Sequence, residues 1–226
     1  MPKPLSTETP IELHLHLASK DDIYLWPDKN HPDYQENKDG TTDAPLQDEL
    51  SGPAIDQDVC SMFFISAYTD HGTSLVTCYG WHIDESSDYY IDDESMLTYA
   101  DEQDGDALEA FDILQKWKKY ISFEDEECPP ICPCCIYISR LFVNPDYRQK
   151  HLASIILKNL DRLFDKYMQT LRYAVTIINP DTPPEGMTKK QMETIMIKTL
   201  RKAGFVKIGT TDDEKHHPVF AKHYHP

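Results

Sequence analysis

The chain has 226 residues, enough to bury a substantial core in one large domain or two small ones. No apolar run approaches the length of a membrane span, and the N-terminal MPKPLSTETP lacks the apolar centre of a secretory signal. We therefore expect a soluble, cytoplasmic protein.

Charge is unevenly distributed along the chain. Residues 1–127 contain 30 Asp and Glu against 7 Lys, whereas residues 128–226 contain 9 acidic against 15 basic residues, and the net charge is −17. An acidic surface attracts cations and repels nucleic acid. We therefore expect a cationic partner and no nucleic acid, although acidity also serves solubility alone, above all in the acidic insertion 84–127.

The N-terminal half begins with a regular segment and continues irregularly. The segment IELHLHLA, residues 11–18, alternates apolar and polar residues, which predicts a half-buried strand. Its two histidines, His14 and His16, could be ligands, but a solvated strand face explains them too. Residues 19–58 are rich in Pro, Asp, Asn and Gly, which predicts a long irregular acidic segment.

A hairpin and an insertion follow. Residues 60–70 and 73–84 read as two strands around the turn residues Asp70-His71-Gly72. Residues 84–105 form an acidic insertion, and residues 106–121 predict a helix with apolar residues on one face. Together they form the acidic and helical insertion 84–127.

Six cysteines occur, four of them within CPPICPCC at residues 128–135. A zinc site normally shows two separated pairs of ligands, and vicinal Cys134 and Cys135 would point to opposite faces of a strand. A disulfide framework needs a secretory context. We expect structural cysteines and no metal site.

The C-terminal half contains a strand, a basic turn and a helix. The strand 136–143 ends at Asn144-Pro145, and an amphipathic helix of about four turns follows from Leu152. The start of a helix favours an anion, most often a phosphate, and Arg148 and Lys150 add positive charge there. Arg148 and Lys150 could equally be two ordinary solvated side chains.

The remaining elements are a buried strand in LRYAVTIINP (residues 171–180), a helix in TKKQMETIMIKTLRKAGF (residues 188–205) and two short strands. The helix is predicted to end at Gly204, a typical residue just beyond a helix C-terminus. The short strands lie in FVKIG and PVFAKHY.

Residues 134–208 contain, in order, a strand, VNPDYRQKHLA, a helix, a strand, a helix, AGF and a strand. This order resembles the GCN5-related N-acetyltransferase (GNAT) family. The acetyl-CoA signature of the family, Gln/Arg-x-x-Gly-x-Gly/Ala, corresponds to Arg148–Ala153, with His151 in place of the first glycine. A His can replace the glycine if its backbone stays in the α region at the start of the helix and its ring turns away. The alternative is that the His151 side chain blocks the cleft and nothing binds.

The resemblance implies one α/β domain over residues 1–226, with a mixed, mostly antiparallel six- to seven-stranded sheet and helices on both faces. Acetyl-CoA would lie in a gap between the strands 134–143 and 173–178. Its pantetheine arm would pair with backbone at 141–143 and its pyrophosphate with N–H groups of 149–153. The implied cofactor-binding residues are Leu141, Phe142, Val143, Arg148, Gln149, Lys150, His151, Leu152, Ala153, Ser154 and Asn179.

Several residues are candidates for the catalytic acid and base. The tyrosine that many GNAT members place four residues before the Gly of GF is Leu200 here. We take Glu127 as candidate base and Tyr224 as candidate acid; residues 124–126, Asp84, Glu85 and His223 are alternatives. Some members of the family act mainly by positioning the amine against the thioester.

The resemblance implies an acetyl-CoA-dependent N-acetyltransferase that modifies a primary amine of a cationic small molecule or protein. Two alternatives remain open. One is a catalytically degenerate GNAT-like module for binding or regulation, and the other is an acidic interaction protein that mimics nucleic acid. A homodimer is compatible with each of them.

Overall fold

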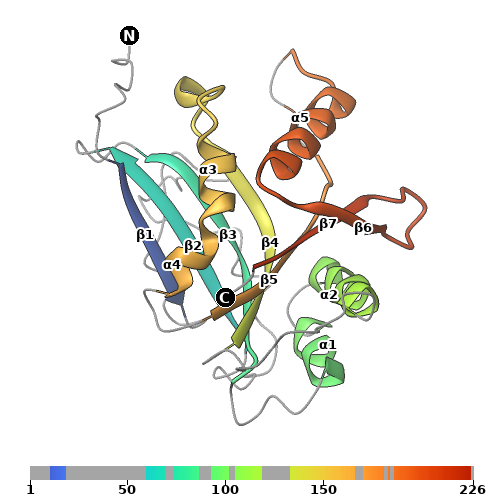
Figure 1. Ribbon diagram of the computed structural model, residues 1–226. Coiled ribbons are helices and arrows are strands. Elements are labelled where there is room, and N and C mark those ends of the chain that lie inside the picture. Colours follow the sequence, from blue (N-terminus) through green and yellow to red (C-terminus); the bar gives the residue numbers. More distant parts are fainter. Residues whose placement is uncertain are drawn as a thin grey trace, which may run out of the picture.

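The protein forms one seven-stranded sheet with helices on both faces (Figure 1). The computed structural model describes residues 11–18, 60–69, 74–86, 93–101, 105–118, 133–165, 170–180, 183 and 186–224. The strands are β1 (Ile11–Ala18), β2 (Cys60–Thr69), β3 (Ser74–Asp84), β4 (Pro133–Val143), β5 (Thr170–Ile177), β6 (Val206–Thr210) and β7 (Pro218–His223). The helices are α1 (Asp93–Asp101), α2 (Gly105–Lys118), α3 (Leu152–Lys158), α4 (Leu160–Asp165) and α5 (Lys189–Lys202).

The strand order in the sheet is β1-β2-β3-β4-β5-β7-β6. All neighbours are antiparallel except β4 and β5, which are parallel and are joined through α3 and α4. A parallel pair needs such a crossover, because the chain must return to the same end of the sheet. The mixed, mostly antiparallel sheet confirms the expected fold class.

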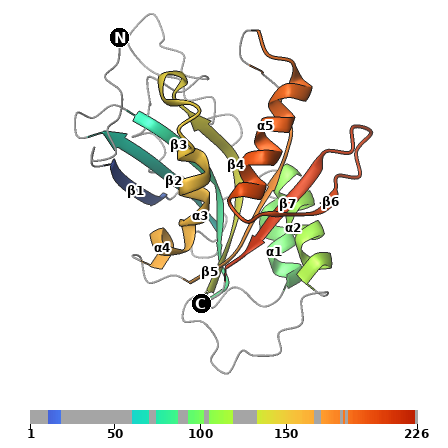
Figure 2. The ribbon, with the colours of Figure 1, turned by 45° about the horizontal axis from the view of Figure 1, so that its top comes forward.

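Two apolar cores lie on the two faces of the sheet. One packs under α3, α4 and α5, and the other packs under α1 and α2. Figure 2 shows the two groups of helices on either side of the strands. Cys134 belongs to the first core and Cys135 to the second, which confirms that these cysteines point to opposite faces. Cys128 and Cys132 lie outside the described residues.

The insertion between β3 and β4 contains two helices in the described residues. Helix α2 agrees with the helix predicted at 106–121, and α1 lies within 84–105, for which the sequence predicted an acidic insertion without naming a helix. Met96 and Ala100 are the buried residues that anchor α1 against the second core. They are only two positions in an acidic stretch, so the sequence carries little periodic signal there.

The helix after the basic turn is also different from the prediction. One helix of four turns was expected, but α3 ends at Lys158 and α4 begins at Leu160. Asn159 lies between them with φ −112° and ψ 22°, and its side-chain amide donates to the Ile155 carbonyl at 2.7 Å. Asn side chains compete with the helix backbone in this way, which explains the break. None of the helices in the described ranges has the length and apolarity needed to cross a membrane.

Candidate active site between β4 and β5

The two parallel strands separate part-way along their length. Pairing runs from Pro133–Thr170 to Tyr137–Val175 and then stops, although β4 continues to Val143 and β5 to Ile177. The last four residues of β4, 140–143, still pair with β3 on the other side. A gap therefore opens between β4 and β5, and it leads towards the turn that follows Val143.

A β-bulge lies where the strands separate. Gly80 pairs with Ile138 and Tyr79 with Arg140, so Ser139 is an extra residue in β4. A Cβ atom on Gly80 would lie 1.9 Å from the Tyr137 carbonyl oxygen, and only glycine permits this approach. Ile138 faces the first core, and the next β4 residue to do so is Leu141, three positions later. The bulge therefore shifts the alternation of the strand by one residue. The exposed backbone of β4 beyond the bulge faces the gap.

Thr176 bridges the two strands at the same point. Its hydroxyl donates to the carbonyl oxygen of Ile138 at 2.8 Å, and both residues are buried. The next pair in the ladder would have been Ile138 and Thr176. A side chain therefore takes the place of a backbone donor at the first position of the gap.

The turn between β4 and α3 adopts a left-handed backbone at two residues that are not glycine. Gln149 has φ 65°, and His151 has φ 61° and ψ 14°. His151 therefore does not have the α-region backbone that was the condition for a His in place of the glycine. The signature position in the GNAT family is usually glycine, which adopts this region without strain. Left-handed residues within a turn gather successive N–H groups into a concave site that suits an anion.

Side chains brace this turn from both ends. The guanidinium Nε of Arg148 donates to the Val143 carbonyl at 3.1 Å, and the Ser154 hydroxyl donates to the His151 carbonyl at 2.8 Å. The ammonium of Lys150 lies 4.8 Å from the centre of the buried Tyr147 ring. Residues 148–151 are all exposed, so their side chains can reach a ligand.

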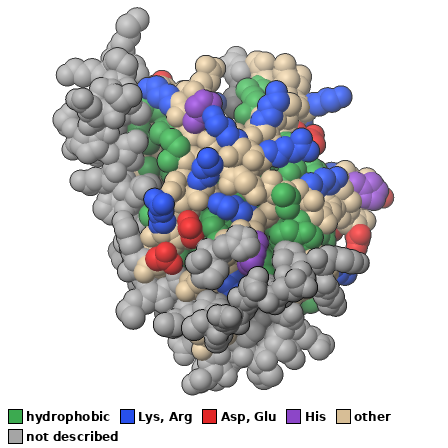
Figure 3. Space-filling model, in the orientation of Figure 1, with side chains coloured by type: hydrophobic (Ala, Val, Ile, Leu, Met, Phe, Trp, Pro, Cys, Tyr) green, Lys and Arg blue, Asp and Glu red, His purple; other side chains and the backbone are tan. Residues whose placement is uncertain are grey.

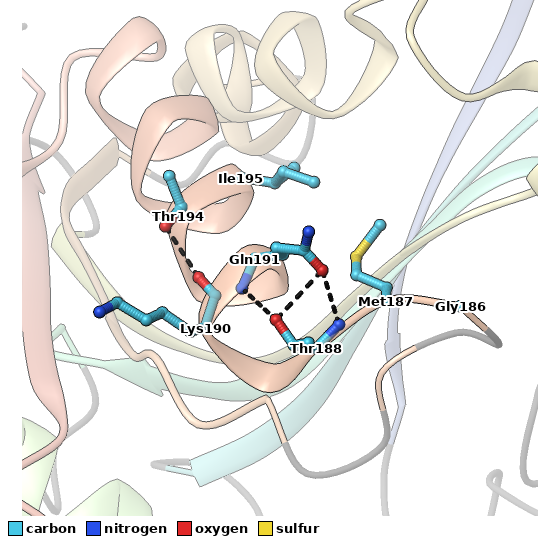
Figure 4. Close-up of a pocket in the computed structure, with 7 residues that line it drawn as sticks. All are labelled: Gly186, Met187, Thr188, Lys190, Gln191, Thr194 and Ile195. Atoms are coloured by element: carbon cyan, nitrogen blue, oxygen red, sulfur yellow. Dashed lines mark hydrogen bonds between the residues drawn. The ribbon is translucent and has the colours of Figure 1, made fainter.

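Helix α5 lies across the gap from α3, and the two helices contact each other. An open pocket lies at the N-terminus of α5, where Thr188 and Gln191 form a reciprocal cap (Figure 4).

Apolar surface is exposed beside the gap. Ile195 on α5 and Ile155 on α3 each expose 51% of their surface. Figure 3 shows many basic side chains on this face of the molecule. The pocket lining is Gly186, Met187, Thr188, Lys190, Gln191, Thr194 and Ile195.

The predicted cofactor-binding residues come together at the open end of the gap. Leu141, Phe142 and Val143 end β4, and residues 148–154 form the turn and the start of α3. Asn179 follows β5 at the same end, two residues beyond Ile177. Sequence reasoning missed Thr176 and the bulge, although the unusual Gly80 within a strand and the three-residue spacing from Ile138 to Leu141 are signals of an irregular strand.

The predicted acid does not lie at the gap. The backbone N–H of Tyr224 donates to the Arg172 carbonyl at 2.9 Å, which places Tyr224 at the closed, paired end of β5. Its hydroxyl donates to the Leu157 carbonyl at 2.8 Å, and burial raises its pKa well above the usual value. His223 stacks on Tyr173 at the same end, with 4.8 Å between the ring centres.

The candidate bases that the structure describes also lie away from the gap. The buried Glu85 carboxylate lies at the closed end, 3.5 Å from Arg172 and 3.8 Å from Lys118, and accepts from the Cys135 thiol at 3.1 Å. Asp84 accepts hydrogen bonds from Ser86. Glu127 and residues 124–126 lie outside the described residues. The described part of the chain thus brings none of the candidate acids and bases to the gap.

A parallel pair that opens at a bulge in a mixed seven-stranded sheet, with the signature turn at the open end, is the arrangement that the family resemblance implies. The chain has a GNAT-like fold. No family model matches its sequence, and no curated protein matches it.

Several solved structures share the GNAT-like fold at low sequence identity. An aminoglycoside acetyltransferase in complex with coenzyme A and kanamycin is 13% identical over 94% of this chain and 95% of that one, with a TM-score of 0.41. An agmatine N-acetyltransferase in its apo form is 12% identical over 94% and 100%, with a TM-score of 0.44. Arylalkylamine N-acetyltransferase 2 from Aedes aegypti is 16% identical over 93% and 98%, with a TM-score of 0.42.

Proposed function

We propose that the protein is an acetyl-CoA-dependent N-acetyltransferase. The observation that carries this proposal is the gap between β4 and β5, which leads to a turn with two left-handed residues. An extended chain with amide groups fits a gap lined by strand backbone, and a pyrophosphate fits the turn. Coenzyme A has both parts in this order.

The cofactor would use backbone for its arm and the turn for its phosphates. Pantetheine amides would pair with the β4 backbone at 141–143, in place of the strand that is missing there. The N–H groups of residues 149–153 would bind the pyrophosphate, and Arg148 and Lys150 would neutralise it. Ser154 supports the turn through His151, and Asn179 lies at the open end.

The reaction would be direct transfer. The neutral amine attacks the thioester carbon, a C–N bond forms, the C–S bond breaks, and coenzyme A leaves as a thiolate that gains a proton. Glu127 remains the candidate base. The position of Tyr224 at the closed end favours a structural role over the proposed acid, so we assign most of the acceleration to positioning of the two reactants.

The acceptor would be a primary amine on a cationic small molecule or protein. The excess of acidic residues in the first 127 positions supports this choice, because it attracts cations and repels nucleic acid. A cytoplasmic location, where acetyl-CoA is available, would suit this activity.

Calorimetric titration with acetyl-CoA tests the proposal, followed by a panel of amines with detection of the free thiol. We expect Arg148→Ala to weaken acetyl-CoA binding by about 1–3 kcal/mol, the range for a hydrogen bond to a charged group. Arg162→Ala is the matched control, since Arg162 is an exposed arginine on α4, beyond α3 from the turn. Absence of binding by the wild type at millimolar acetyl-CoA would refute the proposal.

A second candidate is a GNAT-like module that binds coenzyme A without turnover. Leu200 at the position of the usual tyrosine favours it, as does the placement of Tyr224 and Glu85 away from the gap. Binding of acetyl-CoA with no thiol release across the amine panel would support this candidate over the enzyme.

A further inference from the structure

Thr176 lies where the pairing between β4 and β5 ends. It is the first residue of β5 beyond the last β4–β5 pair, and its backbone is held on the other side by pairing with Phe220 of β7. It is 7% exposed, and it lies on the face of the first core, since its neighbours Val175 and Ile177 belong to the second. Its hydroxyl is thus directed across the gap on the side where α3 lies.

The contact of Thr176 with Ile138 lies where the two strands separate. In a continued parallel ladder, a backbone N–H of β5 would donate to the Ile138 carbonyl and hold the strands about 4.8 Å apart. Here the donor is a side-chain oxygen, at 2.8 Å from that carbonyl. The backbone pairing therefore ends at this point while the buried carbonyl keeps a partner.

The bulge acts at the same level from the other side of β4. Ser139 follows Ile138 directly, and Gly80 permits the bulge by lying against the Tyr137 carbonyl. The backbone of β4 is therefore fixed on one side by Gly80 and on the other by Thr176. The inner end of the gap, next to Ser139, has a defined position relative to the turn at residues 148–153.

We propose that Thr176 is a positioning residue for the acyl end of the bound thioester. This inference rests on the proposed function, because it assumes that the cofactor arm runs from the turn along β4 towards Ser139. The phosphate end would lie at the turn and the acyl end beside the Ile138–Thr176 contact. Thr176 would then affect the arm of the cofactor and not its nucleotide.

Two ligands separate this role from a general loss of stability. One is acetyl-CoA, and the other is 3′-phosphoadenosine 5′-diphosphate, the nucleotide half of coenzyme A, which has no arm. We expect Thr176→Val to weaken acetyl-CoA binding about tenfold, the effect of one lost buried hydrogen bond, with nucleotide binding changed less than about twofold. Thr176→Ser keeps the hydroxyl and should bind both ligands like the wild type.

A buried threonine elsewhere is the control. The Thr211 hydroxyl accepts from the His217 N–H and contacts Asp213 in the β6–β7 connection, so Thr211→Val should lower the melting temperature without changing either affinity. If Thr176→Val does not fold, Thr176→Ala removes the same hydroxyl without adding a methyl group and is titrated instead.

Three results would overturn the inference. Equal acetyl-CoA affinity in Thr176→Val and the wild type would show that the contact has no positioning role and would leave the proposed function intact. An equal loss for both ligands would show a merely structural role. Failure of the wild type to bind acetyl-CoA would refute the proposed function, and this inference with it.

Discussion

His151 combines a left-handed backbone with a branched, aromatic side chain, and this combination has an energetic cost. The left-handed region costs a residue with a Cβ atom about 1–2 kcal/mol relative to the right-handed region, and glycine has no such penalty. The residue is exposed, and its side chain makes no capping hydrogen bond. The His151 side chain therefore contributes little that offsets the strain.

We predict that His151→Gly raises the free energy of unfolding by about 0.5–1 kcal/mol, because relief of strain exceeds the added flexibility of the unfolded chain. Acetyl-CoA affinity should stay equal or improve. Denaturant unfolding and calorimetry measure the two quantities. His151→Ala keeps the left-handed strain and should show no gain in stability; a gain equal to that of glycine would contradict the explanation.

Tyr224 provides a second prediction at this scale. Tyr224→Phe removes the donor to the Leu157 carbonyl and should lower the free energy of unfolding by about 1–2 kcal/mol. Because Tyr224 lies at the closed end of β5, we expect kcat to change less than about twofold. A large loss of kcat with unchanged stability would restore the tyrosine as the acid.

The same tyrosine gives a pH dependence. Burial raises the pKa of Tyr224 well above the usual tyrosine value of about 10, so the folded protein keeps this proton where the unfolded chain loses it. Stability linked to the residue is complete below about pH 10 and is lost as pH rises through the folded pKa. Unfolding followed from pH 9 to 11 should show a smaller loss of stability in Tyr224→Phe than in the wild type.

At the scale of elements, the ion group at Glu85 connects the end of β3, the end of α2 and the start of β5. Only 5% of the Glu85 side chain is exposed, and two cations lie beside it. Removing one partner from a buried ion group leaves charge without compensation, which costs more than a surface pair contributes. This group therefore attaches the helical insertion to the sheet.

We predict that Glu85→Gln lowers the free energy of unfolding by about 3 kcal/mol, as for other broken buried ion pairs. Asp112→Asn is the control, because Asp112 pairs with Lys116 on the exposed side of α2 and should cost no more than about 0.5 kcal/mol. Chemical denaturation of both variants makes the comparison. Equal, small losses would mean that the insertion does not depend on Glu85.

Elements with a complete local signal could be predicted from the sequence. Helix α5 has a signal at each end: a reciprocal cap at Thr188 and Gln191 where it starts, and a left-handed Gly204 just beyond its last residue. The break at Asn159 could not, because it depends on one side chain that bonds to the backbone of its own helix. The bulge at Ser139 has partial signals in Gly80 and in the spacing from Ile138 to Leu141, but its position depends on the contact with β3. The turn at 148–153 was located correctly, but its backbone conformation was not, since His rarely adopts it.

At the scale of the whole molecule, the charge asymmetry should govern encounter with the acceptor. The net charge of −17 comes from the first 127 residues, while the proposed cofactor site belongs to the basic remainder. At ordinary ionic strength, salt largely screens the interaction between exposed charges that lie more than about 8–10 Å apart. We predict that the acceptor KM rises as salt increases from 50 to 300 mM, roughly threefold or more. A neutral or anionic preferred acceptor with constant KM would contradict a cationic acceptor.

The helical insertion also bears on how the chain can be shortened. Antiparallel neighbours such as β3 and β4 need only a tight turn between them, so residues 85–132 look dispensable on a topology diagram. Yet α1 and α2 cover the apolar face formed by residues such as Tyr137, Val175 and Ile177. A trimmed protein with a short hairpin would keep its strand order and expose that face to water. Aggregation, and not loss of topology, would be the outcome of such trimming.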